Sequence, residues 1–332
     1  MAQLQSTNIL GSFNLSGATQ NISTVGNVWY NSTVNKLQYS YTGFGAGTWS
    51  AGGNLINGRV QLGGAGTQNA GLAAGGSPSS PNLERCTEEY DGSSWSAGGA
   101  LITGAASGAA AGTQNAGLFM GGTPLPVKVA TEEYNGSAWS TGGNLIVGRF
   151  SLTAQGTQNE ALAFGGTSLP TILACTEEYN GTSWATGGAL INARCDSAGA
   201  GTQNEALAFG GQSTPGAVIS CTEEYNGTSW TAGGAMIVAR CALGGAGTQN
   251  AGLAFGGRNP GSVCCTEEYN GTLWSVGGNL INRRFGLVGA GTQNAALAFG
   301  GQNYSVCATN NTEEYNKAEV ICICTLYQTF LK

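Results

Sequence analysis

The chain contains no histidine, and charged residues make up only 9% of its 332 residues, against roughly 25% in an ordinary soluble domain. The absence of histidine removes the commonest general base and the commonest metal ligand. The 12 basic residues are scattered and form no phosphate-binding patch, so nucleic acid is not an expected partner. No apolar run is long enough to span a membrane, so no membrane insertion is expected.

The cysteines and the N-terminus do not suggest secretion. Residues 1–15 carry no positive charge and no long apolar run, so we expect no signal peptide. Four of the ten cysteines stand at the same site of a repeated motif, directly before Thr-Glu-Glu-Tyr, rather than as partners for one another: Cys86, Cys175, Cys221 and Cys265. We interpret the cysteines as small buried side chains of a protein made in a reducing compartment. No metal site and no cofactor are expected.

Glycine, with 57 residues, and an internal repeat dominate what is present. The tripeptide Thr-Gln-Asn recurs at steps of about 45 residues, a period that suits four short strands and their turns. It starts at Thr19, Thr67, Thr113, Thr157, Thr202, Thr248 and Thr292, and the motif Thr-Glu-Glu-Tyr starts at Thr87, Thr131, Thr176, Thr222, Thr266 and Thr312. No segment shows a helical period, so an all-β fold is predicted.

Residues 240–281 illustrate the strands expected in one unit. We predict strands over 240–243, 251–255, 264–269 and 272–281, with a loop over 244–250. Asn270-Gly271 joins the last two strands and predicts a type I′ hairpin turn, which needs positive φ at both central residues.

Large and small side chains alternate within the second of these strands. Leu253 and Phe255 share one face, whereas Gly252 and Ala254 share the other, because successive side chains point to opposite faces. The large face of one sheet can therefore pack on the small face of the next, as radially arranged sheets require. Closing the ring leaves no exposed end sheet, so we predict a β-propeller with four antiparallel strands per blade, and an open solenoid is the alternative.

Gly256-Gly257, Tyr269, Trp274 and Arg284 follow one another in this unit. This order resembles the kelch-type repeat of β-propellers, which places a double glycine after the second strand, then a tyrosine, a tryptophan and an arginine. The resemblance covers residues 38–316. Two repeats depart from it, since Ala105 replaces the arginine in one and no tryptophan follows Tyr315 in the last.

The number of blades depends on how the first, degenerate repeat is counted. Its segments are 18–21, 27–30, 37–41 and Trp49, with a spacing close to that of the other repeats. We therefore expect seven blades, and six, with the two termini sharing the closing blade, is the alternative. Residues 1–332 are expected to form a single propeller. Residues 1–56 would be the degenerate first blade, 57–281 five regular repeats and 282–332 the closing blade.

The repeated charged and amide residues are interpreted as structural. A buried carboxylate needs a counter-charge or hydrogen bonds, so we predict contacts between the first glutamate of each Glu-Glu pair and a repeated arginine in at least three repeats. The glutamates are Glu88, Glu132, Glu177, Glu223, Glu267 and Glu313, and the arginines are Arg59, Arg149, Arg194, Arg240 and Arg284. The Thr-Gln-Asn loops are expected to bond to loop backbone. Rings of carboxylates or amides that bind a ligand are the alternatives.

The loops after the double glycines differ between repeats and would lie together on one face. They cover residues 77–85, 123–129, 167–173, 212–220, 258–263 and 302–310. Recognition usually resides in loops on a rigid scaffold, so the non-recurring Arg85, Lys128, Arg258 and Tyr304 are the candidate binding residues. No catalytic residue is assigned, and unselected variation of the surface is the alternative interpretation.

Residues 26–49 resemble a short β-meander of tail-fibre and other structural proteins of tailed bacteriophages, and the glycine-rich array resembles virion-associated proteins of marine phages. This resemblance implies a non-enzymatic virion protein (tail-fibre, appendage or capsid-associated), made in the host cytoplasm and located in the virion. Its expected partners are other virion proteins and a host surface polysaccharide. A kelch-type protein-interaction propeller and a glycan-active enzyme, which would need one asymmetric cluster of carboxylates in a pocket, are the alternatives.

Overall fold

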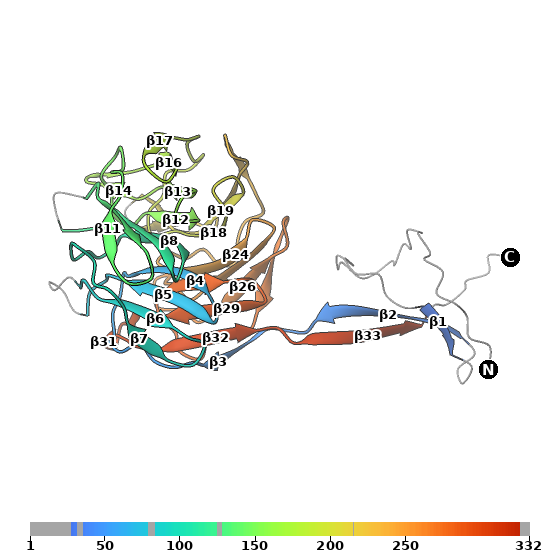
Figure 1. The fold of residues 1–332 in the computed structure, drawn as a ribbon. Coiled ribbons are helices and arrows are strands. Elements are labelled where there is room, and N and C mark those ends of the chain that lie inside the picture. The colour runs from blue at the N-terminus through green and yellow to red at the C-terminus, as the bar shows by residue number, and fades with distance from the viewer. Residues whose placement is uncertain (1–27, 32–35, 79–83, 125–127, 215, 326–332) are drawn as a thin grey trace. The chain divides into compact units, whose positions relative to one another are not determined.

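The computed structural model describes residues 28–31, 36–78, 84–124, 128–214 and 216–325, which form strands and turns (Figure 1). The chain divides into two compact units, Thr48–Asn316 and Met1–Gly47 with Lys317–Lys332. Within Thr48–Asn316, six antiparallel sheets of four strands each form the blades of a β-propeller. In the described part of the chain, no helix has the length and apolar character needed to cross a membrane.

The innermost strands of the six blades surround the axis. They are β4 (Gly63–Thr67), β8 (Ala109–Thr113), β12 (Thr153–Gly156), β18 (Ala198–Gly201), β24 (Gly244–Thr248) and β28 (Val288–Gly291). Each contacts the innermost strand of the next blade, and β28 contacts β4, so the ring is closed. Glycine is needed where these strands converge: a Cβ atom at Gly245 would lie 2.6 Å from the carbonyl oxygen of Gly199.

The predicted position of the first strand is wrong. The prediction put it at residues 240–243, whereas β24 covers Gly244–Thr248, which was expected to be a loop. Glycine is rare in ordinary strands because a half-buried sheet surface favours branched and aromatic residues. The crowded axis of the propeller reverses that preference. Residues 240–243 instead belong to a connection in which Ala242 has a φ of 51°.

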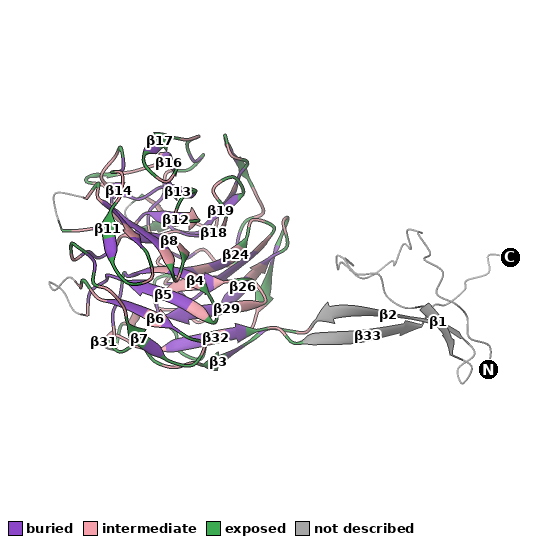
Figure 2. Ribbon diagram, viewed as in Figure 1, coloured by how far each residue is buried: buried purple, intermediate pink, exposed green. Residues whose placement is uncertain are grey.

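The second and third strands of each blade carry most of the core. The second strands are β5 (Ala70–Ala74), β9 (Ala116–Met120), β13 (Ala161–Phe164), β19 (Ala206–Phe209), β25 (Ala251–Phe255) and β29 (Ala295–Phe299). The third strands are β6 (Thr87–Tyr90), β10 (Thr131–Tyr134), β16 (Thr176–Tyr179), β22 (Thr222–Tyr225), β26 (Thr266–Tyr269) and β32 (Thr312–Asn316). Leu253 and Phe255 of β25 pack with Ala296 and Ala298 of the next blade, which confirms the predicted packing of a large face on a small one. Figure 2 shows these strands as the buried part of each blade.

The outer strands begin at the repeated tryptophans. They are β7 (Trp95–Ala97), β11 (Trp139–Thr141), β17 (Trp184–Thr186), β23 (Trp230–Ala232), β27 (Trp274–Gly277) and β3 (Thr48–Ala51). The predicted type I′ turn is wrong, because Gly271 has a positive φ and Asn270 does not. Asn270 Oδ1 instead accepts hydrogen bonds from the backbone N–H groups of Thr272 and Leu273, and this Asx arrangement closes a four-residue turn.

The expectation of seven blades is wrong, and the six-blade alternative is correct. The sixth sheet has the order β28-β29-β32-β3, so a strand from the start of the chain completes the last blade. Trp49 lies opposite Tyr315 in that sheet. The last repeat has no tryptophan of its own because Trp49 supplies it from the other end of the sequence.

The other unit contains a separate three-stranded sheet rather than part of a seventh blade. Its order is β1 (Val28–Asn31), β2 (Lys36–Phe44) and β33 (Glu319–Thr325), all antiparallel. Residues 18–21 of the expected first blade lie outside the described residues. The described thiols, which include Cys86 and Cys265 of the repeated site, are free.

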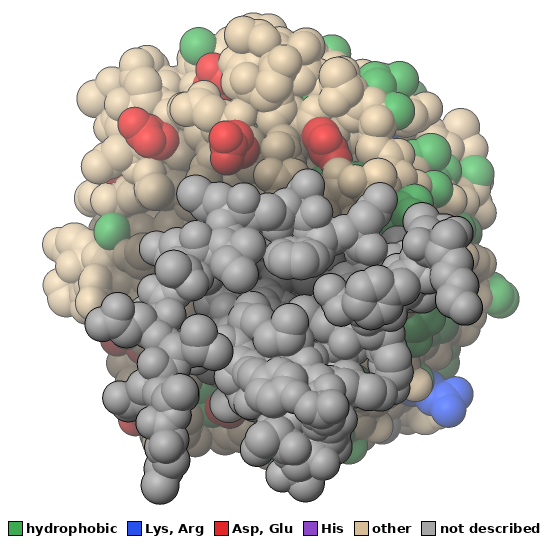
Figure 3. Space-filling view, turned by 90° about the vertical axis from the view of Figure 1, so that its right-hand side faces the viewer, with side chains coloured by type: hydrophobic (Ala, Val, Ile, Leu, Met, Phe, Trp, Pro, Cys, Tyr) green, Lys and Arg blue, Asp and Glu red, His purple; other side chains and the backbone are tan. Residues whose placement is uncertain are grey.

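Three of the variable loops contain short hairpins. These are β14 (Thr167–Ser168) with β15 (Thr171–Ile172), β20 (Gln212–Thr214) with β21 (Ala217–Val218), and β30 (Gln302–Asn303) with β31 (Val306–Ala308). On the face shown in Figure 3, most of the described surface is uncharged polar side chain or backbone, with acidic groups standing apart from one another.

Candidate functional site

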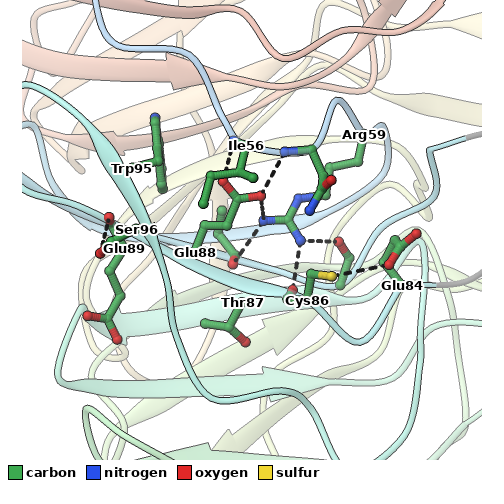
Figure 4. Close-up of polar contacts among 12 residues, drawn as sticks. Ile56, Arg59, Glu84, Cys86, Thr87, Glu88, Glu89, Trp95 and Ser96 are labelled. Carbon is green, nitrogen blue, oxygen red and sulfur yellow. Dashed lines mark hydrogen bonds and ion pairs between the residues drawn. The ribbon is translucent and has the colours of Figure 1, made fainter.

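Five buried arginine–glutamate pairs hold the connections between blades. Arg59 and Glu88 illustrate them (Figure 4): the guanidinium lies 3.0 Å from Oε1 of Glu88 and donates to the carbonyl oxygen of Cys86 at 2.7 Å. The other pairs are Arg149–Glu177, Arg194–Glu223, Arg240–Glu267 and Arg284–Glu313. The predicted glutamate–arginine contact is confirmed in more than the three repeats required, so these carboxylates are structural partners.

The repeat with Ala105 in place of arginine uses a lysine from its variable loop. Lys128 Nζ donates to the carbonyl oxygen of Gly104 at 2.6 Å. Burial lowers the pKa of Lys128, and the nearby charge of Glu132 acts against that shift. In the structure the ammonium group of Lys128, a predicted binding residue, is bonded to the Gly104 carbonyl and lies near enough to Glu132 for that carboxylate to act on its pKa.

The second glutamate of each pair links neighbouring blades through a tyrosine. Tyr90 Oη donates to Oε1 of Glu314 at 2.6 Å and thereby joins the first blade to the last. The same bond joins Tyr134 to Glu89, Tyr179 to Glu133, Tyr225 to Glu178, Tyr269 to Glu224 and Tyr315 to Glu268. Six bonds therefore form a closed ring around the propeller.

The Thr-Gln-Asn loops form a second ring of this kind. Gln114 Nε2 donates to the carbonyl oxygens of Gly71 at 3.1 Å and Tyr90 at 2.7 Å, both in the preceding blade. Gln68, Gln158, Gln203, Gln249 and Gln293 make equivalent bonds. The expected bonds to loop backbone are made by threonine in three of these loops, where Thr157, Thr202 and Thr292 accept from backbone N–H groups. The glutamine bonds to strands of the preceding blade were not predicted, and they hold the blades together.

The tyrosine–glutamate ring predicts a cooperative loss of structure at alkaline pH. Burial, reinforced by the hydrogen bond to glutamate, raises the pKa of Tyr90, Tyr134, Tyr225 and Tyr269 to about 12, above the value of about 10 for a free phenol. The folded state then holds protons that the unfolded state releases, so stability is complete below pH 10 and falls as the pH rises toward 12. We expect phenolate absorbance from these side chains and loss of circular dichroism to appear together in one titration.

A titration of Tyr225→Phe provides the control, since its cooperative step should contain one phenolate fewer. Full phenolate absorbance from a protein that keeps its native circular dichroism would contradict the prediction.

A third ring lies on the axis and consists of backbone bonds between successive connections. The backbone N–H of Asp196 donates to the carbonyl oxygen of Ser151 at 3.0 Å, and the N–H of Ala242 donates to that of Asp196 at 2.8 Å. Gln61, Ser107, Ser151, Asp196, Ala242 and Gly286 are joined in this way, and the N–H of Gln61 donates to Gly286 to close the ring. All six have positive φ, between 51° and 65°.

The residue before each member of this axial ring pairs with the residue after the double glycine of the same repeat. Cys241 forms such a bridge with Arg258, and Phe285 forms one with Gln302. The axial ring therefore lies on the same face of the propeller as the variable loops. These loops were predicted to lie together on one face.

A pocket of about 180 Å³ lies at the axial ring. Its lining includes the ring residues and, beside them, Arg258, Phe285 and Gln302. The chemistry differs around the circle, because Asp196 is a carboxylate whereas Ala242 and Gly286 present no polar side chain. Gln212 Nε2 donates to Oδ2 of Asp196 at 3.3 Å and so orients the carboxylate.

The candidate residues Arg258 and Tyr304 converge on Phe285. The guanidinium carbon of Arg258 lies 5.1 Å from the centre of the Phe285 ring, and the ring of Tyr304 is also 5.1 Å from it. Burial by itself lowers the pKa of Arg258. Contact with the Cys241 thiol and the charge of Asp196 raise this pKa by more, so the pKa is raised overall. Arg258 and Asp196 are therefore close enough to interact.

The other two candidates lie apart from this group. Arg85 Nε donates to the carbonyl oxygen of Leu101 at 2.6 Å in the connection beyond its own blade, and Lys128 belongs to the Ala105 repeat. Neither Asp196 nor Phe285 was predicted from the sequence. A signal was present, because the two positions that follow the repeated arginine, or Ala105, change in type from repeat to repeat. The first position holds Val60, Ala106, Phe150, Cys195, Cys241 and Phe285, and the second holds Gln61, Ser107, Ser151, Asp196, Ala242 and Gly286.

The described residues contain no group of three or more carboxylates or thiols placed to hold a metal ion. No protein-family model matches the chain, and no curated protein matches it. Among solved structures it is similar to one entitled "Structure of YjhT", with a TM-score of 0.66 and 13% sequence identity, over 79% of this chain and 96% of that chain. Likeness at this identity shows the fold alone: the chain is a six-bladed β-propeller.

Proposed function

We propose that this protein is a non-enzymatic structural protein of a tailed-bacteriophage particle, and that its propeller binds a host surface glycan at the axial pocket. The observation that carries the proposal is the contrast between the repeated residues, which are used to join blades, and the axial pocket, where the blades differ in chemistry. The particle as its location rests on the resemblance of residues 26–49 and of the repeat array to phage virion proteins.

The repeat is proposed to be of the kelch type. Its marker residues hold the positions that this type requires: Gly256-Gly257 follows the second strand of the blade, Tyr269 ends the third, and Trp274 begins the outer strand. The closed hydrogen-bonded rings and the shortage of surface charge suit a rigid propeller displayed outside a cell.

The polar groups at the pocket favour binding over hydrolysis. Glycosidases act with a pair of carboxyl groups on either side of the scissile bond, and Asp196 is the one carboxylate among the described residues that line the pocket. A carboxylate, a guanidinium and an amide can hold the hydroxyl groups of a sugar by hydrogen bonds.

Two measurements test the proposal: whether purified particles contain the protein, and whether the isolated protein binds host polysaccharide. We expect mass spectrometry and immunogold labelling to find it in purified particles, and the isolated protein to bind extracted host polysaccharide without releasing reducing sugar. Arg258→Ala should weaken binding about tenfold or more, as for loss of a charged hydrogen-bond donor. The control Arg283→Ala removes an exposed arginine outside the pocket and should bind normally.

Absence from purified particles would overturn the virion assignment. Release of reducing sugar would favour a glycan-active enzyme, and capture of one specific protein instead of polysaccharide would favour a kelch-type adaptor.

A further inference from the structure

We infer that the axial pocket binds glycan end-on and takes a single neutral terminal sugar unit, with Asp196 and Arg258 as the residues that select it. This inference rests on the proposed function and specifies which part of the glycan is recognised. It depends on the closure of the axial ring, the size of the pocket and the balance of charge at its wall.

The axial ring closes the pocket on all sides. Each member of the axial ring comes from a different connection between blades, and backbone hydrogen bonds of 2.7–3.0 Å join all six into a circle. A cavity within a closed circle has no lateral opening through which a polymer could pass. A sugar chain can therefore enter by an end or by a terminal branch unit, whereas an internal segment would have to lie across the entrance.

The axial pocket is small and its wall is rigid. The pocket of about 180 Å³ and the cavity of about 100 Å³ that adjoins it along the axis are each smaller than the roughly 300–1,000 Å³ of sites that hold drug-sized ligands, so the pocket suits one sugar ring and not several. Its wall is already formed, because the hydrogen bonds between neighbouring ring residues fix the backbone. Little ordering is then needed when a ligand binds, and such preorganisation favours affinity.

The wall of the pocket carries two opposite charges. Asp196 and Arg258 place one negative and one positive group at the same pocket, so their charges balance. An acidic sugar would be attracted by Arg258 but repelled by Asp196, and a cationic sugar the reverse, so the pocket gives a charged sugar no net electrostatic advantage. A neutral sugar instead offers hydroxyl groups that can donate to the carboxylate and accept from the guanidinium, and such charge-assisted bonds are the stronger ones.

The acceptor capacity of Asp196 leaves room for a ligand. A carboxylate has about four lone-pair sites, and Gln212 Nε2 occupies one on Oδ2. Phe285 is buried and packs against the Arg258 guanidinium, so it helps to place that group rather than contacting a ligand. Asp196 and Arg258 can then accept hydrogen bonds from, and donate them to, the hydroxyl groups of a pyranose ring.

The experiment uses the full-length protein and neutral polysaccharide extracted from the propagating host, separated into fractions of different chain length. Non-reducing ends in each fraction are counted by methylation analysis. End-on binding predicts that the amount of protein bound per gram rises in proportion to the number of ends. Internal binding predicts the same capacity per gram in every fraction.

A pair of matched variants tests the residues. Asp196→Asn keeps the size of the side chain and a residue type that tolerates positive φ, and we expect binding about tenfold weaker or worse. Asp91→Asn removes the same charge at a turn on the opposite face, where another repeat already has Asn180 making the same backbone bonds. Its binding should equal that of the wild type.

The outcomes separate the two proposals. The end-on inference falls, while glycan binding stands, in either of two cases. In the first, the amount of wild-type protein bound per gram does not depend on the number of chain ends. In the second, Asp196→Asn binds as well as Asp91→Asn. If wild-type protein binds no neutral fraction but does bind unfractionated host polysaccharide, the inference falls and glycan binding stands. If it binds neither, both the inference and the proposed glycan function fall.

Discussion

Replacing Arg284 with alanine is expected to lower the free energy of unfolding by about 3–5 kcal/mol, because it leaves a buried charge without its partner. Arg284 lies 3.3 Å from Oε1 of Glu313, and both side chains are 1% exposed. Arg284 also donates to the carbonyl oxygens of Asn311 and Ala298. Burial lowers the pKa of Arg284 to about 10, and the Glu313 carboxylate works against that shift.

The neighbouring arginine provides a matched control for this substitution. Arg283 is exposed, so Arg283→Ala should change stability by no more than about 0.5 kcal/mol. Denaturant unfolding of the two variants measures the difference directly. Equal midpoints would show that the buried pairs do not hold the connections between blades.

Replacing Trp49 with alanine is expected to cost about 3–5 kcal/mol, as for other buried aromatic side chains, and also to open the ring. The Trp49 ring lies 4.9 Å from that of Phe255 and 5.0 Å from that of Tyr315. Its Nε1 donates to Oγ1 of Thr266 at 2.9 Å. β3 is the outermost strand of its blade and pairs with β32 alone, so losing these contacts should release it.

Two variants distinguish opening of the ring from general loss of stability. Trp139→Ala removes equivalent contacts in β11, where the strand belongs to the same stretch of chain as its blade, and should be destabilised to a similar degree. Limited proteolysis under native conditions should cut residues 48–62 of Trp49→Ala and not of Trp139→Ala. Ser50→Ala, on the exposed side of β3, should resist cleavage; equal protection of all three would contradict the closing role of β3.

The roles of the repeated residues could be interpreted from the sequence because each repeat must satisfy the same buried charges and pack the same large and small side chains. Glu267 and Arg240 had to meet, since a buried carboxylate requires a counter-charge, and Leu253 with Phe255 had to face small residues in the next sheet. Errors arose where the environment inverted an ordinary preference. The axis of the propeller selects glycine in β24, and the hairpin at Asn270 is closed by an Asx arrangement instead of the expected type I′ turn.

The site was harder to predict, because its residues are distant in sequence. Arg258 and Tyr304 were found as loop residues that do not recur, but Asp196 and Phe285 were not, since both lie in the connections between blades and outside the variable loops after the double glycines. Arg85 and Lys128 satisfied the same criterion and lie elsewhere. Variation between repeats identifies the face on which residues differ, and it does not identify which of them meet.

The period, the alternation of large and small residues and the repeated ion-pair partners are local properties, so the sequence by itself determined a propeller of four-stranded blades. The number of blades and the axial pocket were decided only by the tertiary structure. Both depend on closure of a ring: β3 completes a blade whose other strands lie more than two hundred residues away, and six connections meet at the axis. Contacts of that range depend on the geometry of the whole circle, which no single repeat contains.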